Sequence, residues 1–189
     1  MSYEKEIFKA NNLVADSKHA EALPIYEKWA KKGSNDCARY LGWMYLYGLG
    51  CDKSTENAQE MFSIGSLAGD KESKFGLAKV YIELKDYSAA YKLLSELSRE
   101  FYPPSDYWLG WFYENGYHVN QDIMEAMSFY SRASSAGHIY ACQRECYLML
   151  RGVRGMLCRF YAIIKRFRLL LIAFSVASRA PLTDPRLLK

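Results

Sequence analysis

The residues best suited to chemistry in this sequence are its histidines and cysteines, which serve in proteins as metal ligands, nucleophiles or acid–base groups. His19, His118 and His138 lie far apart in the sequence, and none has a cysteine or carboxylate at metal-ligand spacing. Cys142 and Cys146 are four residues apart, so a helix would place both thiols on one face, but no CxxC pair completes a metal set. We interpret the histidines as surface or turn residues, and all five cysteines as small apolar core residues that stay reduced.

Short motifs that are typical of enzymes are incomplete in this chain. Gly48-Leu49-Gly50 has the glycine spacing of a phosphate-binding loop, but it follows a predicted helix and not a strand, so we interpret it as a turn. Gly65-Ser66 lacks the GxSxG frame of a nucleophile elbow, and the sequence contains neither GxxxxGKS nor HExxH. The sequence therefore predicts no catalytic, cofactor-binding or metal site, no small-molecule substrate, and a protein that is not an enzyme.

The elements that carry these residues repeat along the chain. Alanines recur at positions 22, 58, 90, 126 and 162, at intervals of 36, 32, 36 and 36 residues. After the alanines at 22, 58 and 126, a bulky pair, a small pair and a glycine follow at the same offsets, as in Phe129-Tyr130, Ala133-Ser134 and Gly137. Apolar spacing of three and four on both sides of each alanine predicts two amphipathic helices per unit. A repeating array of helical hairpins is the expected architecture.

The glycines of this template have two different physical reasons. Gly42 and Gly110 fall inside predicted helices, where glycine costs up to about 1 kcal/mol in helix propensity, so we expect a neighbouring helix to approach closely there. Gly33, Gly69 and Gly137 stand just after the second helix of their units. At that position a residue in the left-handed conformation ends the helix, and glycine adopts it without steric cost.

The run AxxxLGxxYxxGxGVxxDxxxAxxWYxxAAxxG is the pattern of Sel1-like repeats, and this sequence resembles that family. The units at 35–70 and 105–137 match it best, those at 1–34 and 71–104 read closer to tetratricopeptide repeats, and a weaker unit covers 138–178. The resemblance implies an all-α fold, an α-α superhelix (solenoid) of about five helix-turn-helix hairpins over residues 1–178, with a flexible tail at 179–189. Such proteins occur mostly in bacteria and usually act as adaptors or scaffolds.

The first helix of each hairpin lines the concave surface of a solenoid, where extended partners bind. One face of these helices carries aromatic and basic residues, and we expect it to contact a protein partner. The candidate residues are Tyr40, Trp43, Tyr47, Lys79, Trp108, Trp111, Asn115, Tyr147 and Arg151. In the alternative interpretation, Trp43 and Trp111 simply pack between neighbouring hairpins.

The C-terminal part of the chain differs in charge from the rest. Residues 1–137 carry 15 basic and 19 acidic groups, a net charge of −4, whereas residues 138–189 carry 10 and 2, a net charge of +8. Apolar residues from Met156 to Phe174 step by three and four, which predicts a basic amphipathic helix. Its cations for a membrane or an acidic partner would be Arg159, Lys165, Arg166 and Arg168. Alternatively this helix caps the solenoid, and nucleic acid is the weakest of the candidate partners.

Residues 1–16 contain no hydrophobic core of a secretory signal, because charged residues interrupt every apolar stretch, so we expect a cytoplasmic protein. The sequence favours a non-catalytic adaptor or scaffold that binds protein partners through a helical-repeat groove, without nucleic acid or cofactors. The alternative is a peripheral protein that docks on the inner face of the membrane through the basic helix. A regulatory subunit of an enzyme would have the same sequence features as the adaptor.

Overall fold

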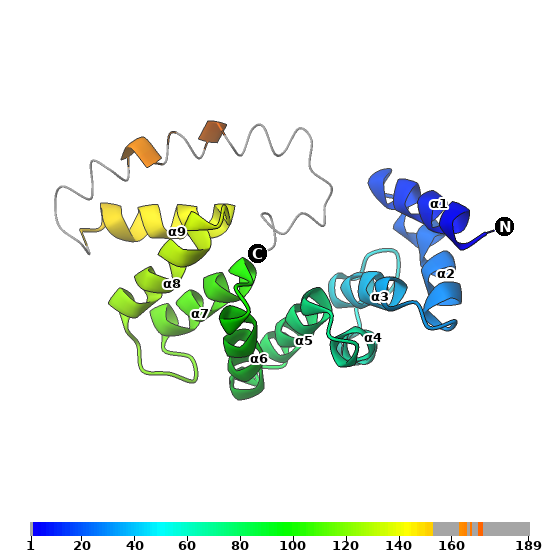
Figure 1. Ribbon diagram of the computed structural model, residues 1–189, viewed down its shortest axis with the longest axis horizontal. Helices are drawn as coiled ribbons and strands as arrows, with labels where there is room; N and C mark the ends of the chain where they lie inside the picture. The colour runs from blue at the N-terminus through cyan, green and yellow to red at the C-terminus, as the bar shows by residue number, and fades with distance from the viewer. Residues whose placement is uncertain (1, 153–162, 166, 168–169, 172–189) are drawn as a thin grey trace. The chain divides into compact units, whose positions relative to one another are not determined.

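A computed structural model describes residues 2–152, 163–165, 167 and 170–171, and these residues form helices and connecting turns without any strand. Figure 1 follows the nine numbered helices in chain order. Their bounds are α1 Tyr3–Ala15, α2 His19–Ala30, α3 Asn35–Tyr47, α4 Thr55–Leu67, α5 Lys71–Glu83, α6 Tyr87–Arg99, α7 Pro103–Asn115, α8 Ile123–Ser135 and α9 Ile139–Leu150. The predicted pairs of helices, each about a dozen residues long, are therefore confirmed.

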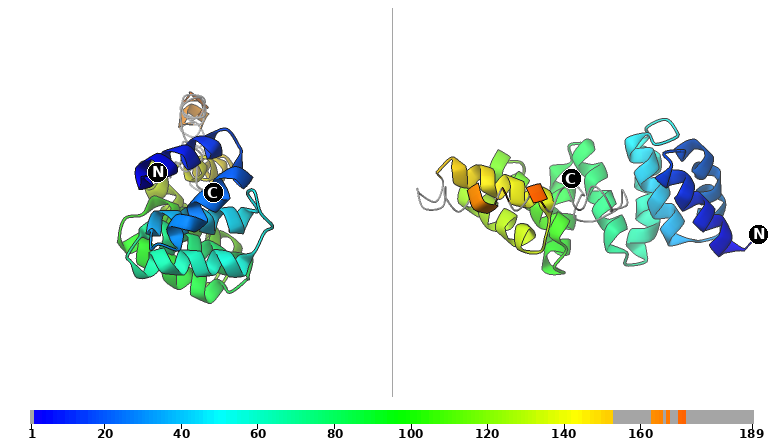
Figure 2. Two further views of the ribbon diagram at one scale, coloured as in Figure 1. Left: turned by 90° about the vertical axis from the view of Figure 1, so that its right-hand side faces the viewer. Right: turned by 90° about the horizontal axis from the view of Figure 1, so that it is seen from above.

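The chain divides into two compact units, residues 1–93 and 94–189, with the boundary inside α6. In the first unit α1 packs on α2 and α3 on α4, and these hairpins stack through contacts of α2 with α3 and of α4 with α5. In the second unit α8 packs against both α7 and α9. Figure 2 shows the helices from two further directions. This stacking of consecutive hairpins is the all-α, solenoid type of packing that was predicted.

Two sequence segments stand outside this description. Of the fifth predicted unit, 138–178, the structure gives α9 and a few helical positions between 163 and 171. The predicted tail at 179–189 lies outside the described residues.

Polar side chains fix where several of the helices begin. Ser34, Ser54, Asp70 and Asp122 each accept a hydrogen bond from a backbone N–H in the first turn of the helix that follows. The Nδ1 atom of His138 does the same for α9 and accepts from the amide of Ala141 at 3.1 Å. Each such cap typically stabilises a helix by about 1 kcal/mol. His138 lies in the connection between α8 and α9, as one of the two interpretations expected, but the other, a surface position, is wrong because its side chain is fully buried.

The glycines that follow the second helices have the predicted backbone conformation. Gly33, Gly69 and Gly137 have φ angles of 89°, 83° and 89°. In all three, the glycine N–H donates to the carbonyl of the residue three positions earlier. The N–H of the residue after the glycine donates to the carbonyl five positions before it. A side chain at these positions would be strained even though nothing lies near a Cβ atom there.

The glycines inside helices leave room for an aromatic ring from the second helix of a hairpin. A Cβ atom at Gly42 would lie 2.6 Å from the ring of Phe62, and one at Gly76 would lie 2.3 Å from the same ring. Phe62, on α4, is therefore held between α3 and α5 by two positions that have no side chain. Gly110 receives the ring of Tyr130 in the same way, at 2.8 Å. The predicted close approach of a neighbouring helix at Gly42 and Gly110 is confirmed.

Candidate functional site

In the first unit, the candidate residues of α3 differ in how far they reach solvent. Tyr40 stacks on Tyr26, with ring centroids 5.1 Å apart, and belongs to the core around α2. The ring of Trp43 lies 4.8 Å from that of Phe62 on α4 and packs in the core between the hairpins. Tyr47 stacks in parallel on the outer side of Trp43 at 5.8 Å, and 51% of its surface is exposed. Tyr47 is thus the member of the three that can meet a partner without unpacking the core.

The charged groups beside Tyr47 come from α5 and from the turn after α3. Lys53 forms an ion pair with Glu83 at 3.0 Å, near the end of α5. Burial, and next the Glu83 carboxylate, raise the pKa of Tyr47, so its hydroxyl is a neutral hydrogen-bond donor at physiological pH. Lys79, one turn earlier on α5, is only 7% exposed and lies in the packed interior.

In the second unit, the candidate residues of α7 form a half-buried aromatic cluster. Trp108 and Trp111 make an edge contact at 5.2 Å, and Trp111 lies 4.7 Å from Tyr117 in the turn that follows. Asn115 is exposed and its amide donates to the carbonyl of Trp111 at 2.8 Å. These contacts hold α7 and the α7–α8 turn together, which is a packing role.

Tyr147 on α9 is flanked by two arginines. The guanidinium of Arg144 lies 5.0 Å from the Tyr147 ring centroid and that of Arg151 lies 5.5 Å from it, both within range of a cation–π contact. Arg151 also donates from Nη1 to the Tyr147 hydroxyl at 3.2 Å. Tyr147 is 43% exposed. The side chains of Tyr107, Tyr140, Gln143, Arg144 and Tyr147 line a cavity of about 250 Å³ here.

Glu114 of α7 holds the Arg144 side chain that lines this cavity, and nothing in the sequence pattern distinguishes Glu114 from other acidic residues. It accepts two hydrogen bonds from Arg144, one of them from Nε at 2.8 Å, and one from the hydroxyl of Tyr130 on α8 at 2.7 Å. These hydrogen bonds raise the pKa of Arg144, and burial followed by the Glu114 contact raises that of Tyr130. One largely buried carboxylate thus links α7, α8 and α9.

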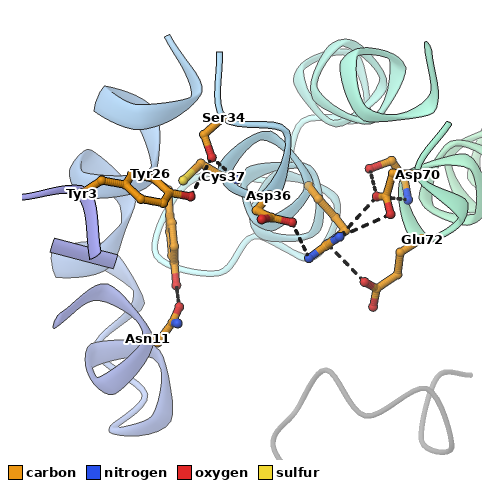
Figure 3. Close-up of polar contacts among 10 residues, drawn as sticks. Tyr3, Asn11, Tyr26, Ser34, Asp36, Cys37, Asp70 and Glu72 are labelled. Carbon is orange, nitrogen blue, oxygen red and sulfur yellow. Dashed lines mark hydrogen bonds and ion pairs between the residues drawn. The ribbon is translucent and has the colours of Figure 1, made fainter. Parts of the chain in front are cut away.

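The corresponding network of the first unit centres on Arg39 of α3. Its guanidinium forms ion pairs with Asp36 at 3.0 Å, Asp70 at 3.3 Å and Glu72 at 3.1 Å, and Figure 3 shows the three carboxylates around it. The same view shows Tyr26 directed at Asn11, to which its hydroxyl donates at 2.7 Å. Because Asp70 and Glu72 lie at the start of α5, their ion pairs with Arg39 link α3 to the next hairpin.

The positions of Arg39 and Asp70 recur 68 residues later as Tyr107 and His138. There the ion pair is replaced by two stacked rings, with centroids 5.1 Å apart and planes at 24°. The same junction between hairpins is therefore ionic in the first unit and aromatic in the second.

Of the four C-terminal cations, Lys165 is the one that falls on a described residue, and Arg159, Arg166 and Arg168 lie outside them. The Lys165 ammonium forms an ion pair with Glu145, a carboxylate of α9 that is 3% exposed. Over the described positions no helix is long and apolar enough to cross a membrane.

The two hairpins whose helices are joined by a turn that contains glycine are also the segments that match a known repeat family. A model of the Sel1 repeat matches residues 35–70 and 103–138, which contain α3–α4 and α7–α8. Two segments of the chain match the Sel1 repeat. The predicted resemblance is thereby confirmed, and the Sel1 hairpins hold both Tyr47 and the Trp108–Trp111 cluster. A comparison with curated proteins finds no significant match.

Solved structures share the fold of this chain. A Sel1 repeat protein from Oxalobacter formigenes is 19% identical, with a TM-score of 0.69 over 87% of this chain and 69% of that one. A Sel1 repeat protein from Klebsiella pneumoniae is 19% identical, with a TM-score of 0.61 over 94% and 93%. The protective antigen c5321 of uropathogenic Escherichia coli, with an SLR fold, is 20% identical, with a TM-score of 0.62 over 86% of this chain and 39% of that one.

Among the residues with described positions, no three histidine, cysteine or carboxylate side chains are placed to hold a metal ion. The exposed aromatic candidates are Tyr47 in the first unit and Tyr147 in the second, and Tyr147 lies beside the cation of Arg151. Such side chains are enriched where proteins bind one another.

Proposed function

We propose that this Sel1-repeat protein is a non-catalytic adaptor that binds protein partners through exposed aromatic residues on the first helices of its hairpins. The observation that carries the proposal is the exposure of Tyr47, whose ring stacks on the half-buried Trp43 and keeps 51% of its surface open to solvent. A rigid aromatic ring of this kind buries a large area on binding and loses little conformational entropy. Tyr147 of α9 offers a second such ring in the other unit.

The test is affinity capture from the source cell with the wild-type full chain, two single tyrosine variants, the double tyrosine variant and one control variant. Tyr47→Ser and Tyr147→Ser remove the two exposed rings, whereas the matched control Leu67→Ser removes a 91% exposed apolar residue from a second helix, α4. We expect the control to retain the proteins captured by the wild type and the tyrosine variants to lose them. Circular dichroism checks that all variants stay helical. Identical capture by the folded double tyrosine variant contradicts the proposal.

A second function, docking on an anionic membrane surface, has its own observation. Five apolar residues at helical spacing are exposed by 57–65% in the C-terminal segment: Ile163, Ile164, Phe167, Leu170 and Leu171. Apolar residues at these intervals share one helix face, as in helices that lie on membranes. Sedimentation with phosphatidylserine vesicles tests this function, because Phe167→Ser should reduce pelleting of the full chain. Equal pelleting with neutral phosphatidylcholine vesicles contradicts it.

A further inference from the structure

We propose that the cavity between α7 and α9 binds an acidic peptide segment, whose apolar side chain enters the cavity while a neighbouring carboxylate pairs with Arg151. This inference rests on the adaptor function and names the chemistry of the partner. The cavity is lined by Tyr107, Tyr140, Gln143, Arg144 and Tyr147. Its volume of about 250 Å³ lies below the range of about 300–1,000 Å³ that is usual for whole small molecules. It therefore suits one side chain of a longer chain.

The charge on this surface is positive because the nearby carboxylates are already paired. Glu114 is largely buried and accepts from Arg144 and Tyr130. Glu145, the one acidic residue of α9, is buried with the ammonium of Lys165 as its partner. Neither carboxylate lines the cavity. An incoming carboxylate therefore meets no repulsion from an exposed acid of α9.

Two groups on this surface remain able to donate to an incoming carboxylate. Arg151 is exposed, and within the described part of the chain it contacts only Tyr147 and forms no ion pair. Glu114 occupies Nε and Nη2 of Arg144 but leaves its Nη1 without a hydrogen bond among the described residues. Because Glu114 fixes one arginine and Tyr147 holds the other, both donors are oriented before a ligand arrives, which lowers the entropic cost of binding.

The geometry favours a peptide over a polyanion. Nucleic acids and anionic membranes are bound by arrays of several cations along a surface. Here the half-buried Arg144 of α9 and the exposed Arg151, which follows α9, lie on either side of the ring of Tyr147. Aromatic anchors beside arginine are the usual composition of the centre of a protein interface.

The experiment is fluorescence polarisation of a fluorescein-labelled peptide of about ten residues, in which one phenylalanine is flanked by glutamates on both sides. The control peptides replace the glutamates with glutamines, or the phenylalanine with alanine. The protein is the full chain as wild type, Arg151→Gln, Tyr147→Ala and Lys92→Gln. Lys92 is an exposed cation of α6, so its variant removes the same charge away from the cavity.

We expect the acidic peptide to bind the wild type more tightly than either control peptide does, and more weakly as salt is raised. Arg151→Gln should weaken binding about tenfold, the usual loss for a hydrogen bond to a charged group, and Tyr147→Ala at least as much. Lys92→Gln should change it less than twofold. Equal binding of the acidic and glutamine peptides, absence of binding, or equal losses in Arg151→Gln and Lys92→Gln would each overturn the inference. If one of these occurs while Tyr47→Ser still abolishes partner capture, the adaptor function stands without this pocket.

Discussion

The ring of Phe62 lies beside Gly42 and Gly76, and it determines whether an alanine at position 42 stabilises or destabilises the protein. The variant Gly42→Ala places a methyl group 2.6–2.8 Å from three atoms of that ring. The ring cannot move away, because a Cβ atom at Gly76 on its other side would be closer still, at 2.3–2.5 Å. Alanine improves helix propensity by about 1 kcal/mol, but overpacking a core costs about 1–3 kcal/mol. Since relief is blocked on both sides, we expect Gly42→Ala to lower the free energy of unfolding by about 2 kcal/mol.

The assay is urea unfolding followed by circular dichroism at 222 nm, in wild-type and Phe62→Leu backgrounds. Leucine lacks the Cε1 and Cζ atoms that an alanine at position 42 would meet, so there Gly42→Ala should be neutral or stabilising by up to about 1 kcal/mol. The control is Gly69→Ala, where nothing lies within 4 Å and φ is +83°. That variant should lose about 1–2 kcal/mol in both backgrounds, because its cost is backbone strain. An equal effect of Gly42→Ala in the two backgrounds would refute the steric reasoning.

Three further outcomes follow from the buried polar groups. Glu114→Gln should lower the free energy of unfolding in urea by about 1–3 kcal/mol, because a charged acceptor of three hydrogen bonds is lost. Burial opposes ionisation of Asp70, but its hydrogen bonds from Ser73 and the Arg39 guanidinium lower its pKa. Its carboxylate therefore stabilises the fold above its unfolded-state pKa, and this contribution is lost as pH falls through the lowered value. The stability deficit of Asp70→Asn, measured by thermal unfolding, should accordingly disappear in acid, and a pH-independent deficit would contradict this. Burial, and next the neighbouring Cys142, raise the pKa of Cys146 to about 11, so mass spectrometry should find iodoacetamide labelling of Cys146 slower than that of the half-exposed Cys142.

The sequence predicted the positions whose residue type has one dominant physical reason. Gly33 and Gly69 need a left-handed backbone, and Gly42 needs room for a ring, so the pattern alone identified these roles. Periodicity likewise identified the helices. A backbone requirement or a steric limit is local, and one sequence is enough to show it.

Residues whose role depends on a partner elsewhere in the chain could not be predicted in this way. Nothing near His138 in the sequence shows that Tyr107 stacks on its ring, so the sequence does not reveal that this turn residue is buried. In the sequence, Glu114 cannot be told from an ordinary solvent-exposed acid. Tyr130 and Arg144, which lie 16 and 30 residues later in the chain, donate hydrogen bonds to it and make it the buried centre of a network. Tyr40, Trp43 and Tyr47 share a helix face, and only the packing of α2 and α4 separates the first two from the exposed Tyr47.

The two chemistries found at equivalent hairpin junctions have a consequence for the order of the repeats. If the hairpins were exchanged, Arg39 would face the imidazole of His138, and Tyr107 would face the carboxylate of Asp70. The first pairing places a cation against an imidazole whose Nδ1 already accepts from Ala141, so that its other nitrogen is a donor and cannot accept from the guanidinium. The second pairing leaves a half-buried carboxylate without its counter-ion, which is costly. Each hairpin junction is therefore stabilised by its native pair of side chains and destabilised by the exchanged pair. The hairpins share one repeat pattern but are not interchangeable, because each junction is stabilised by its own pair of side chains.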